Sequence, residues 1–375
     1  MSWPSKVYAA TESLGVFYSV DFGGPTDPMP TWTALNDGLS SVALRAFCLD
    51  RSATPMDARM FCIDTATRTV WRRTTGTWAA VLTEAQAKII AGTSGPEKLL
   101  SVITDPITGY VYALLQVQDG TGAFRMMRST DHGTTWTAHT IVGNSFWYGD
   151  TNNIDAYNSL VVVNACNWPL NYKIKHSEDD GATWISVTTD GSNHSYNVMI
   201  SPCDPDVWYA GTRGSIYSLV KYSTAAGDPG TVLTPSGDTI AGPYGTGGSI
   251  WFHPTNPDIF AVMNHHPVNN NFLLTLDRGI TAAVSHSALG YLTQFAEHCD
   301  YQQWVQGCTG SGQAVFVSTD GYTVTDRSGT NWNTPPYTNA IPTTSGGVIA
   351  RGLWSLREPT LPWSIYSCMF EQEAP

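Results

Sequence analysis

The chain has 375 residues and a formal net charge of −12, from 19 Lys and Arg against 31 Asp and Glu. This balance excludes the clustered positive charge by which proteins bind nucleic-acid phosphates, so we expect no nucleic-acid partner. The short basic group Arg68, Arg72 and Arg73 is expected on a solvated strand face. No apolar run approaches the roughly 20 residues of a membrane-spanning helix, so we expect no membrane span. The 34 Gly, 22 Pro and 14 Trp, with only 13% charged residues, indicate many short strands joined by tight turns.

The first expected strand is Val7–Ala10, near the start of the chain. Residues 1–20 contain no basic segment followed by an apolar core, so we expect no secretory signal peptide. The low charge and the abundant Thr, Asn and Gly are typical of extracellular or virion surface proteins. We therefore expect an extracellular or virion-surface location, reached by a route such as assembly into a virus particle, while a cytoplasmic location stays open.

Several later strands are expected directly after loops that contain Pro. Because Pro cannot donate a hydrogen bond to a sheet ladder, these loops lead into strands and do not lie inside them. The expected strands are Met60–Ile63 after Pro55, Tyr110–Ala113 after Asp105 and Pro106, Val207–Ala210 after Pro202 and Pro205, and Ile259–Val262 after Pro254 and Pro257. One short helix, Glu84–Ala91, is expected in a connection between strands.

An eight-residue pattern, Ser-x-Asp-x-Gly-x-x-Trp, occurs twice between short apolar runs. Its members are Ser129, Asp131, Gly133 and Trp136, and then Ser177, Asp179, Gly181 and Trp184. The Ser ends one strand, the Asp side chain caps backbone N–H groups of a tight turn, and Gly tolerates a positive φ. The Trp opens the next strand as a large buried ring system. The pattern therefore predicts repeated hairpin corners.

Weaker copies extend the repeat along the chain. They are Ser19, Asp21 and Gly23 before Trp32; Gly76 and Trp78; Thr275, Asp277 and Gly279; and Asp326, Gly329 and Trp332. The stretch from Ser223 to Gly230 preserves almost nothing of the pattern. The fourth strands of successive units are expected to begin near residues 32, 78, 136, 184, 231, 282 and 332. Seven units of about 50 residues then fill most of the chain.

Four antiparallel strands per unit cannot bury their faces alone, so the units must stack around an axis. We therefore predict an all-β fold, a seven-bladed β-propeller that forms a single domain over residues 1–375. The first unit lacks an innermost strand. The apolar segment Val348–Leu356 is expected to supply it, so that N- and C-terminal strands close the ring within one blade.

The Ser/Asp/Gly/Trp elements resemble the Asp box, or bacterial neuraminidase repeat, of sialidase-like β-propellers, including xyloglucanases. The resemblance covers nearly the whole chain and is strongest over residues 129–136 and 177–184. It implies a fold, because the family's Asp box is a structural turn between the third and fourth strands of a blade. Enzymes, receptors, assembly factors and non-catalytic lectin-like proteins share it, so the resemblance does not imply one function.

The resemblance places the ligand site on the rim opposite the Asp turns. The residues expected there are Trp147, Tyr148, Asp150, Asn167, Trp168, His194, Tyr244, His265 and His266. Aromatic rings stack on sugar faces and amides bond hydroxyl groups, so this set suits glycan recognition. The alternative is that these are ordinary loop and inter-blade packing residues.

The enzyme hypotheses need specific residues. A sialidase would need an arginine triad and an early Arg-Ile-Pro motif, which the chain lacks. The segment Tyr18–Gly24 is similar to one that carries a catalytic Asp in xyloglucanases, although that family uses two tandem propellers. An inverting hydrolase would then pair Asp21 with Asp150, whose carboxylates would need to lie roughly 6.5–9.5 Å apart. The alternative for Asp21 is a structural turn residue.

Seven Cys do not form a dense framework in a chain of this size. The pairs Cys48 with Cys62 and Cys299 with Cys308 could each be bridged, or could be small buried hydrophobic residues. No His/Cys ligand spacing occurs, so we expect neither a metal nor a cofactor.

The sequence favours a non-enzymatic binding or structural protein, with a bacteriophage virion surface as its expected place. Its expected partner is a glycan or a protein surface, with assembly into a larger particle. A xyloglucanase-like glycoside hydrolase is the alternative, so the sequence leaves enzymatic activity open.

Overall fold

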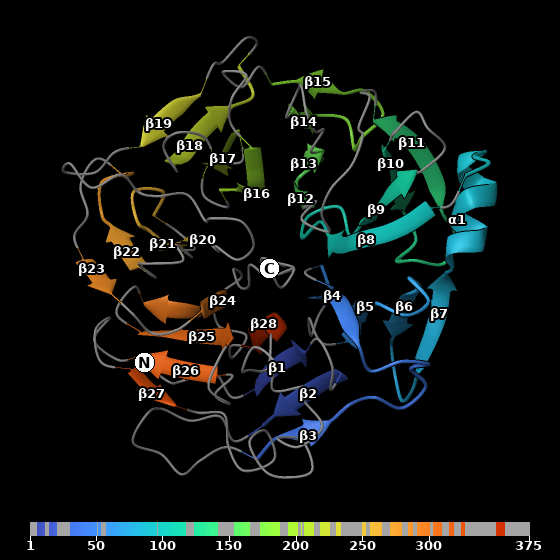
Figure 1. The fold of residues 1–375 in the computed structure, drawn as a ribbon, viewed down its shortest axis with the longest axis horizontal. Helices are drawn as coiled ribbons and strands as arrows, with labels where there is room; N and C mark the ends of the chain where they lie inside the picture. The colour runs from blue at the N-terminus through green and yellow to red at the C-terminus, as the bar shows by residue number, and fades with distance from the viewer. Residues whose placement is uncertain are drawn as a thin grey trace.

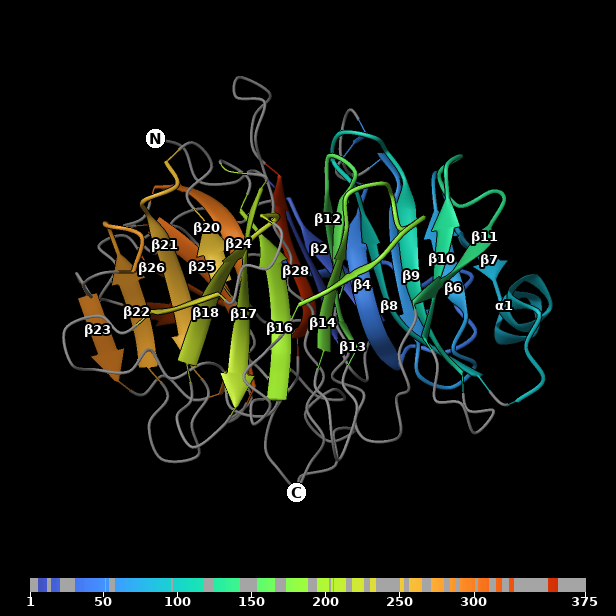
Figure 2. The ribbon, with the colours of Figure 1, turned by 90° about the horizontal axis from the view of Figure 1, so that it is seen from above.

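The fold is a β-propeller: in the computed structural model, four-stranded antiparallel sheets lie around a common centre (Figure 1). Turned by 90°, the strands run roughly along the viewing axis of Figure 1 (Figure 2). The structure describes residues 6–11, 15–20, 31–50, 52–53, 58–95, 97–117, 124–141, 154–165, 173–187, 194–201, 204, 206–213, 218–225, 230–233, 250–252, 256–264, 271–279, 284–287, 291–300, 303–309, 315–318, 324–326 and 350–356.

The strands of these residues form seven sheets, each with its innermost strand first in the order below. One sheet contains β28 (Ala350–Leu356), β1 (Lys6–Thr11), β2 (Gly15–Ser19) and β3 (Thr33–Ala34). Three sheets contain β4 (Leu44–Leu49), β5 (Met60–Asp64), β6 (Val70–Arg73) and β7 (Trp78–Leu82); β8 (Glu97–Thr104), β9 (Val111–Val117), β10 (Phe124–Ser129) and β11 (Thr137–Ile141); and β12 (Ile154–Tyr157), β13 (Leu160–Ala165), β14 (Lys173–Ser177) and β15 (Ile185–Ser186). Three more contain β16 (His194–Ile200), β17 (Val207–Arg213), β18 (Ser218–Ser223) and β19 (Thr231–Leu233); β20 (Ile250–Phe252), β21 (Phe260–Asn264), β22 (Asn271–Thr275) and β23 (Val284–Ser287); and β24 (Tyr291–Asp300), β25 (Gln303–Thr309), β26 (Val315–Ser318) and β27 (Val324–Asp326).

Burial follows position within a sheet. The second strands β5 and β9 are buried on both faces, because neighbouring sheets cover them on either side. The outer strand β11 has exposed residues at Thr137 and Thr140, half-buried residues between them, and a buried residue only at Ile141. A continuous apolar run therefore marks an inner strand and a mixed run marks an outer one.

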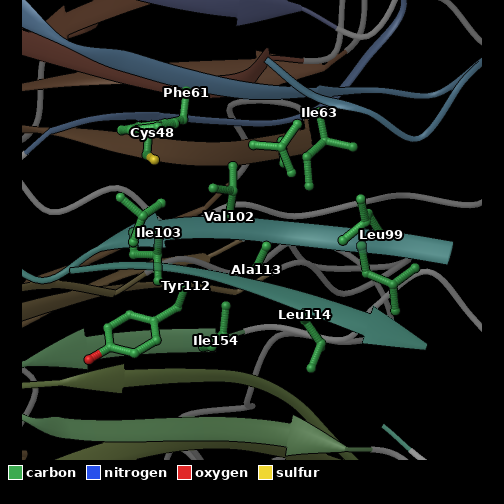
Figure 3. Packing of buried hydrophobic residues seen from close by; sticks show 14 of the residues in the cluster. Cys48, Phe61, Ile63, Leu99, Val102, Ile103, Tyr112, Ala113, Leu114 and Ile154 are labelled. Carbon is green, nitrogen blue, oxygen red and sulfur yellow. The ribbon is translucent and has the colours of Figure 1, made fainter. Parts of the chain in front are cut away.

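The core consists of layers between neighbouring sheets. In Figure 3, Val102 of β8 lies in the layer that also contains Ile63 of β5. The next residue, Ile103, pairs with Tyr112 and belongs to the opposite face of the same sheet, toward Ile154 of β12. Successive strand residues alternate between the two faces, so each sheet contributes to two layers.

The expected helix is confirmed as α1 (Glu84–Ala91), which lies at the outer edge of the molecule (Figure 1). Thr83 accepts a hydrogen bond from the Gln86 N–H, and the Gln86 side chain accepts one from the Thr83 N–H, which forms a capping box. Gly92 ends the helix in the left-handed conformation. In the described residues, no helix is long and apolar enough to cross a membrane.

The expected strands after Pro-containing loops are confirmed, as β5, β9, β17 and β21 begin within a residue of the predicted positions.

The prediction for the fourth strand of the last sheet was wrong. Its fourth strand, β27, is Val324–Asp326, so Asp326 lies in a strand and does not open a turn. Ser318 ends the third strand there, and Asp320 and Gly321 follow it in the sequence. The copy of the pattern that begins at Ser318 has one residue fewer between Asp and Gly than the repeat. The later residues Asp326, Gly329 and Trp332 therefore fit the expected pattern better, which explains the wrong prediction.

Cys48 and Cys62 are buried free thiols. Cys48 pairs across the strands with Phe61, and Cys62 pairs with Phe47, so the two Cys side chains point to opposite faces of the sheet. They act as small buried hydrophobic residues, and burial raises the pKa of the Cys62 thiol. The side chains of Cys299 and Cys308 lie outside the described residues.

Candidate functional site

The third-to-fourth strand turn of the β8–β11 sheet has the geometry that its sequence predicts. Ser129 is the last residue of β10, and its Oγ accepts a hydrogen bond from the Gly133 N–H at 2.7 Å. The Asp131 carboxylate accepts hydrogen bonds from the N–H groups of Thr134 and Thr135, at 3.0 and 2.7 Å. Gly133 has a φ of 84°. The turn therefore satisfies its own backbone donors with two short polar side chains.

Two more turns repeat this geometry. In the β12–β15 sheet, Ser177 Oγ accepts from the Gly181 N–H at 2.7 Å and donates to Asp179 at 2.7 Å. In the β20–β23 sheet, Thr275 takes the place of Ser and accepts from the Gly279 N–H at 2.8 Å. Thr supplies the same hydroxyl, which explains why that copy works without Ser.

The Trp residues of the pattern connect neighbouring sheets. Trp78 Nε1 donates to the Leu35 carbonyl at 2.6 Å, and Trp136 Nε1 donates to the Val81 carbonyl at 3.1 Å. Trp78 is buried as expected. Trp136 and Trp184 are only half-buried, so the expectation of a fully buried ring system fails for the two strongest copies.

The turn carboxylates stay ionised well below neutral pH. Partial burial raises the pKa of Asp131, but hydrogen bonds from the Thr135 N–H and hydroxyl, Ser129 and Thr134 outweigh it and lower the pKa to about 2. The pKa of Asp179 is lowered by the corresponding contacts. A carboxylate of this kind does not donate a proton near neutral pH, so these residues do not suit general-acid catalysis.

We expect carboxyl-carbon NMR to show Asp131 titrating with a midpoint near pH 2. Its folded pKa lies below the ordinary value of 3.8, so its contribution to stability is present above about pH 4 and is lost as the pH falls toward 2. Thr135→Ala removes the hydroxyl donor and keeps the backbone N–H donor, so it should raise the midpoint. Thr137→Ala is the control, because its hydroxyl donates to the Arg128 carbonyl and does not touch Asp131. An unchanged midpoint in Thr135→Ala would contradict this explanation.

The residue between Asp and Gly reaches the preceding sheet in each of these turns. These residues, His132, Asp180 and Arg278, have φ values of 57°, 57° and 58°. His132 Nδ1 lies 3.3 Å from Asp50, Asp180 accepts a hydrogen bond from the Tyr112 hydroxyl at 2.9 Å, and Arg278 Nη1 lies 4.0 Å from Asp204. The left-handed backbone thus directs three different polar side chains across the same kind of interface. Sequence reasoning missed this, because the position tolerates any polar residue.

Two arginine side chains extend across the same interfaces from the preceding sheet to the turn of the next one. Arg72 Nη1 donates to the His132 carbonyl at 2.8 Å, and Arg128 Nη1 donates to the Asp180 carbonyl at 3.1 Å. The expectation of a solvated strand face is therefore wrong for Arg72, because its side chain connects the β4–β7 sheet to the next one.

A buried polar cluster surrounds Asp50, directly after β4. Its carboxylate is fully buried and accepts hydrogen bonds from Arg59 Nε and Ser52 Oγ, both at 2.6 Å. His132 approaches the same carboxylate. Ser52 donates to Asp50 and not to the imidazole, so the cluster lacks the Ser-to-His contact that activates a nucleophile. Its geometry fits a role in joining two sheets.

The residues predicted for the ligand rim are not tested by this structure. Asp21, Trp147, Tyr148, Asp150, Asn167, Trp168, Tyr244, His265 and His266 lie outside the described residues, as does the side chain of His194, the first residue of β16. Among the described residues, the structure brings together the predicted turn residues Ser129, Asp131 and Gly133, and likewise Ser177, Asp179 and Gly181. Within the described ranges, no three His, Cys, Asp or Glu side chains gather closely enough to hold a metal ion.

No model of a known protein family matches the chain, and no curated protein matches its sequence. Solved structures are similar in fold. The GH74 xyloglucanase from Xanthomonas campestris is 14% identical with a TM-score of 0.54, over 85% of this chain and 50% of that one. A protein from Lactobacillus plantarum is 13% identical with a TM-score of 0.57, over 84% and 92% of the two chains.

A functionally unknown protein from Desulfotomaculum acetoxidans is 11% identical with a TM-score of 0.56, over 92% of this chain and 98% of that one. This chain spans half the length of the xyloglucanase and nearly the whole length of the other two. At such identities the likeness concerns the fold and not the activity. The chain has a β-propeller fold in common with these proteins.

Proposed function

We propose that the chain, as one domain over residues 1–375, is a closed seven-bladed Asp-box propeller that binds a glycan or protein surface without catalysis. We place it on a bacteriophage virion surface, as a receptor-recognition or structural component. The observation that carries the non-enzymatic assignment is topological. The described ends of β2 and β11, from which the segments with Asp21 and Asp150 continue, lie at opposite ends of their sheets, which supports a separation of these two carboxylates.

Asp21 belongs with the turn residues. Ser19 ends β2, the third strand of its sheet, and is buried, as are Ser129 and Ser177 at the ends of their third strands. Asp21 follows Ser19 at the same offset at which Asp131 follows Ser129. This offset favours a turn-capping role for Asp21.

Asp150 lies in the connection from β11 to β12, which joins an outer strand to the innermost strand of the next sheet. In an antiparallel sheet of this order, that connection starts at the end opposite the third-to-fourth strand turn. Strands rise about 3.3 Å per residue, so a five-residue strand separates its two ends by roughly 16 Å. A catalytic pair in an inverting glycosidase needs roughly 6.5–9.5 Å.

The same topology supports a shared ligand rim. Asn167 and Trp168 lie between β13 and β14, and His265 and His266 lie between β21 and β22, all in second-to-third strand connections. Tyr244 lies in an outer-to-inner connection, as do Trp147 and Tyr148, and His194 opens β16 at the end of another. Both kinds of connection meet at the end away from the Asp turns.

The described buried carboxylates already have structural partners. Asp64 accepts from Trp71 Nε1 at 2.7 Å, and Asp105 accepts from the Ser159 N–H of the next sheet at 3.0 Å. Asp155 accepts from the Ile200 N–H at 2.9 Å. Asp105 and Asp155 thus connect neighbouring sheets, Asp64 connects strands of one sheet, and each carboxylate already has a hydrogen-bond donor from the protein.

Ring closure rests on the sheet that joins N- and C-terminal sequence. β28 pairs antiparallel with β1, with Tyr8 opposite Trp354, and contacts both β24 and β4. This arrangement supports closure by strands from the two ends of the chain, as in propellers whose last blade is shared.

The test combines a glycan array with a screen for release of reducing sugar. We expect binding without release, and an affinity weaker by about two- to tenfold in Trp147→Ala or Trp168→Ala, because each stacked ring contributes about 0.5–1.5 kcal/mol. Trp136→Ala, at the Asp-turn end, is the control and should bind as the unaltered chain does. Sugar release that is lost in both Asp21→Ala and Asp150→Ala would overturn the proposal in favour of the hydrolase. Absence of binding to every glycan would remove the glycan partner.

A further inference from the structure

One position of the repeat holds a different type of side chain in different sheets. The residue before the last of the third strand is Arg128 in β10 and His176 in β14, and Arg72 holds the corresponding place in β6. Both arginines donate to a backbone carbonyl in the turn of the next sheet. In the sequence of the next sheet, β16–β19, the corresponding stretch from Ser223 to Gly230 has lost the Ser-x-Asp-x-Gly pattern. We call the interface between the β12–β15 and β16–β19 sheets the seam, and a histidine stands there in place of the arginine.

His176 is enclosed by apolar and aromatic groups. Its side chain is 4% exposed, and its ring centroid lies 6.3 Å from that of Trp208 on β17. Trp208 is fully buried and stacks on Tyr222 at 4.3 Å. Neither ring nitrogen of His176, nor Trp208 Nε1, has a hydrogen-bond partner among the described residues. An uncharged imidazole is compatible with such a site, but an imidazolium is not.

Few charged groups of the described residues face this imidazole. The Glu178 carboxylate, on the adjoining turn, is half exposed and lies 3.4 Å from Nε2, which is long for a hydrogen bond, so it acts mainly through its charge. Asp155 of β12 lies on the same face but is separated by Val162, and it already accepts from the Ile200 N–H. From β17 and β18, the facing residues are Trp208 and Tyr222, which carry no charge near neutral pH.

We propose that the seam is acid-sensitive: the packing between the β12–β15 and β16–β19 sheets becomes less stable when His176 is protonated. Burial lowers the pKa of His176, and the Glu178 carboxylate offsets only part of this effect. The unfolded or locally opened chain therefore takes up the proton more readily. The stability of the seam is present above about pH 6.5, the ordinary pKa of His, and is lost as the pH falls below it.

Hydrogen exchange of the full chain at pH 7.5 and 5.5, corrected for intrinsic rates, tests this proposal. We expect protection of β14, β17 and β18 to fall at the lower pH by at most about tenfold, the limit that an unfolded-state pKa near 6.5 sets. Protection of β4 and β5 is the internal reference. His176→Phe keeps an aromatic ring and removes the titration, so the local loss should disappear. His139→Gln is the control: the pKa of His139 is also lowered, by burial and by Arg128, but it lies on β11, away from the seam.

A loss of protection in His176→Phe equal to that of the unaltered chain would overturn the proposal. Glu178→Gln provides a second measurement that changes no buried side chain. Removing this carboxylate takes away the group that favours the imidazolium, so the loss at pH 5.5 should be equal or larger. A smaller loss in Glu178→Gln would contradict the assignment, whether or not His176→Phe folds.

Discussion

Replacing Gly133 with Ala is expected to lower the free energy of unfolding by about 2–5 kcal/mol. Gly133 has a φ of 84°, in the left-handed region, where a Cβ costs roughly 1–2 kcal/mol. The added Cβ would also lie 2.9 Å from a ring carbon of Phe61, which is fully buried in the neighbouring sheet. Phe61 cannot move without disturbing the core, and overpacking of this kind costs about 1–3 kcal/mol.

Gly76→Ala is the matched control for this prediction. Gly76 also has a positive φ, 77°, but its added Cβ would meet no atom within 4 Å. Its cost should therefore be only the backbone component of about 1–2 kcal/mol. Urea unfolding followed by circular dichroism compares the two variants. Equal losses would show that contact with Phe61 contributes nothing and that the turn does not pack on the neighbouring sheet.

Trp208→Ala is expected to lower the free energy of unfolding by about 3–5 kcal/mol. Trp208 is fully buried, stacks on Tyr222 and belongs to the apolar cluster that joins the β12–β15 and β16–β19 sheets. Truncation removes this contact area and leaves a cavity between two sheets that cannot close together. Trp208→Phe retains a ring and removes an indole N–H that has no partner among the described residues, so it should cost less.

Trp184→Ala serves as the comparison for Trp208, in the same urea unfolding measurement. Trp184 is only half-buried, and its indole nitrogen likewise lacks a partner within the described part of the chain. Its truncation should cost about 1–2 kcal/mol, in proportion to the smaller apolar area that it removes from water. A loss as large as that of Trp208→Ala would show that burial at the seam is not what determines the cost.

Much of the local structure could be predicted from the residues. Ser129, Asp131 and Gly133 form their turn through contacts within five residues, so the pattern alone specifies the geometry. The helix Glu84–Ala91 was predictable for the same reason, because its capping box lies in the adjacent sequence. The turn of the last sheet was not predictable in this way. Its copy of the turn pattern is one residue shorter, and a later Asp and Trp fitted the pattern better.

The contacts between sheets were beyond the reach of pattern reasoning. Asp50 and His132 come from different units, and nothing near either residue identifies the other as its partner. Arg72 carries no signal that separates an exposed arginine from one that bonds the next turn. Which connections between strands lie at the same end of the sheets follows from the order of the strands, which is a property of whole sheets.

Local hydrogen bonds and the alternation of apolar residues specify the corners and strands, because these interactions need only neighbouring residues. The pairing of β28 with β1, the polar contacts across each interface and the enclosure of His176 by Trp208 depend on which sheets lie side by side. That arrangement follows from burying both faces of every sheet at once. This requirement applies to the assembled propeller as a whole, and the sequence of a single repeat does not specify it.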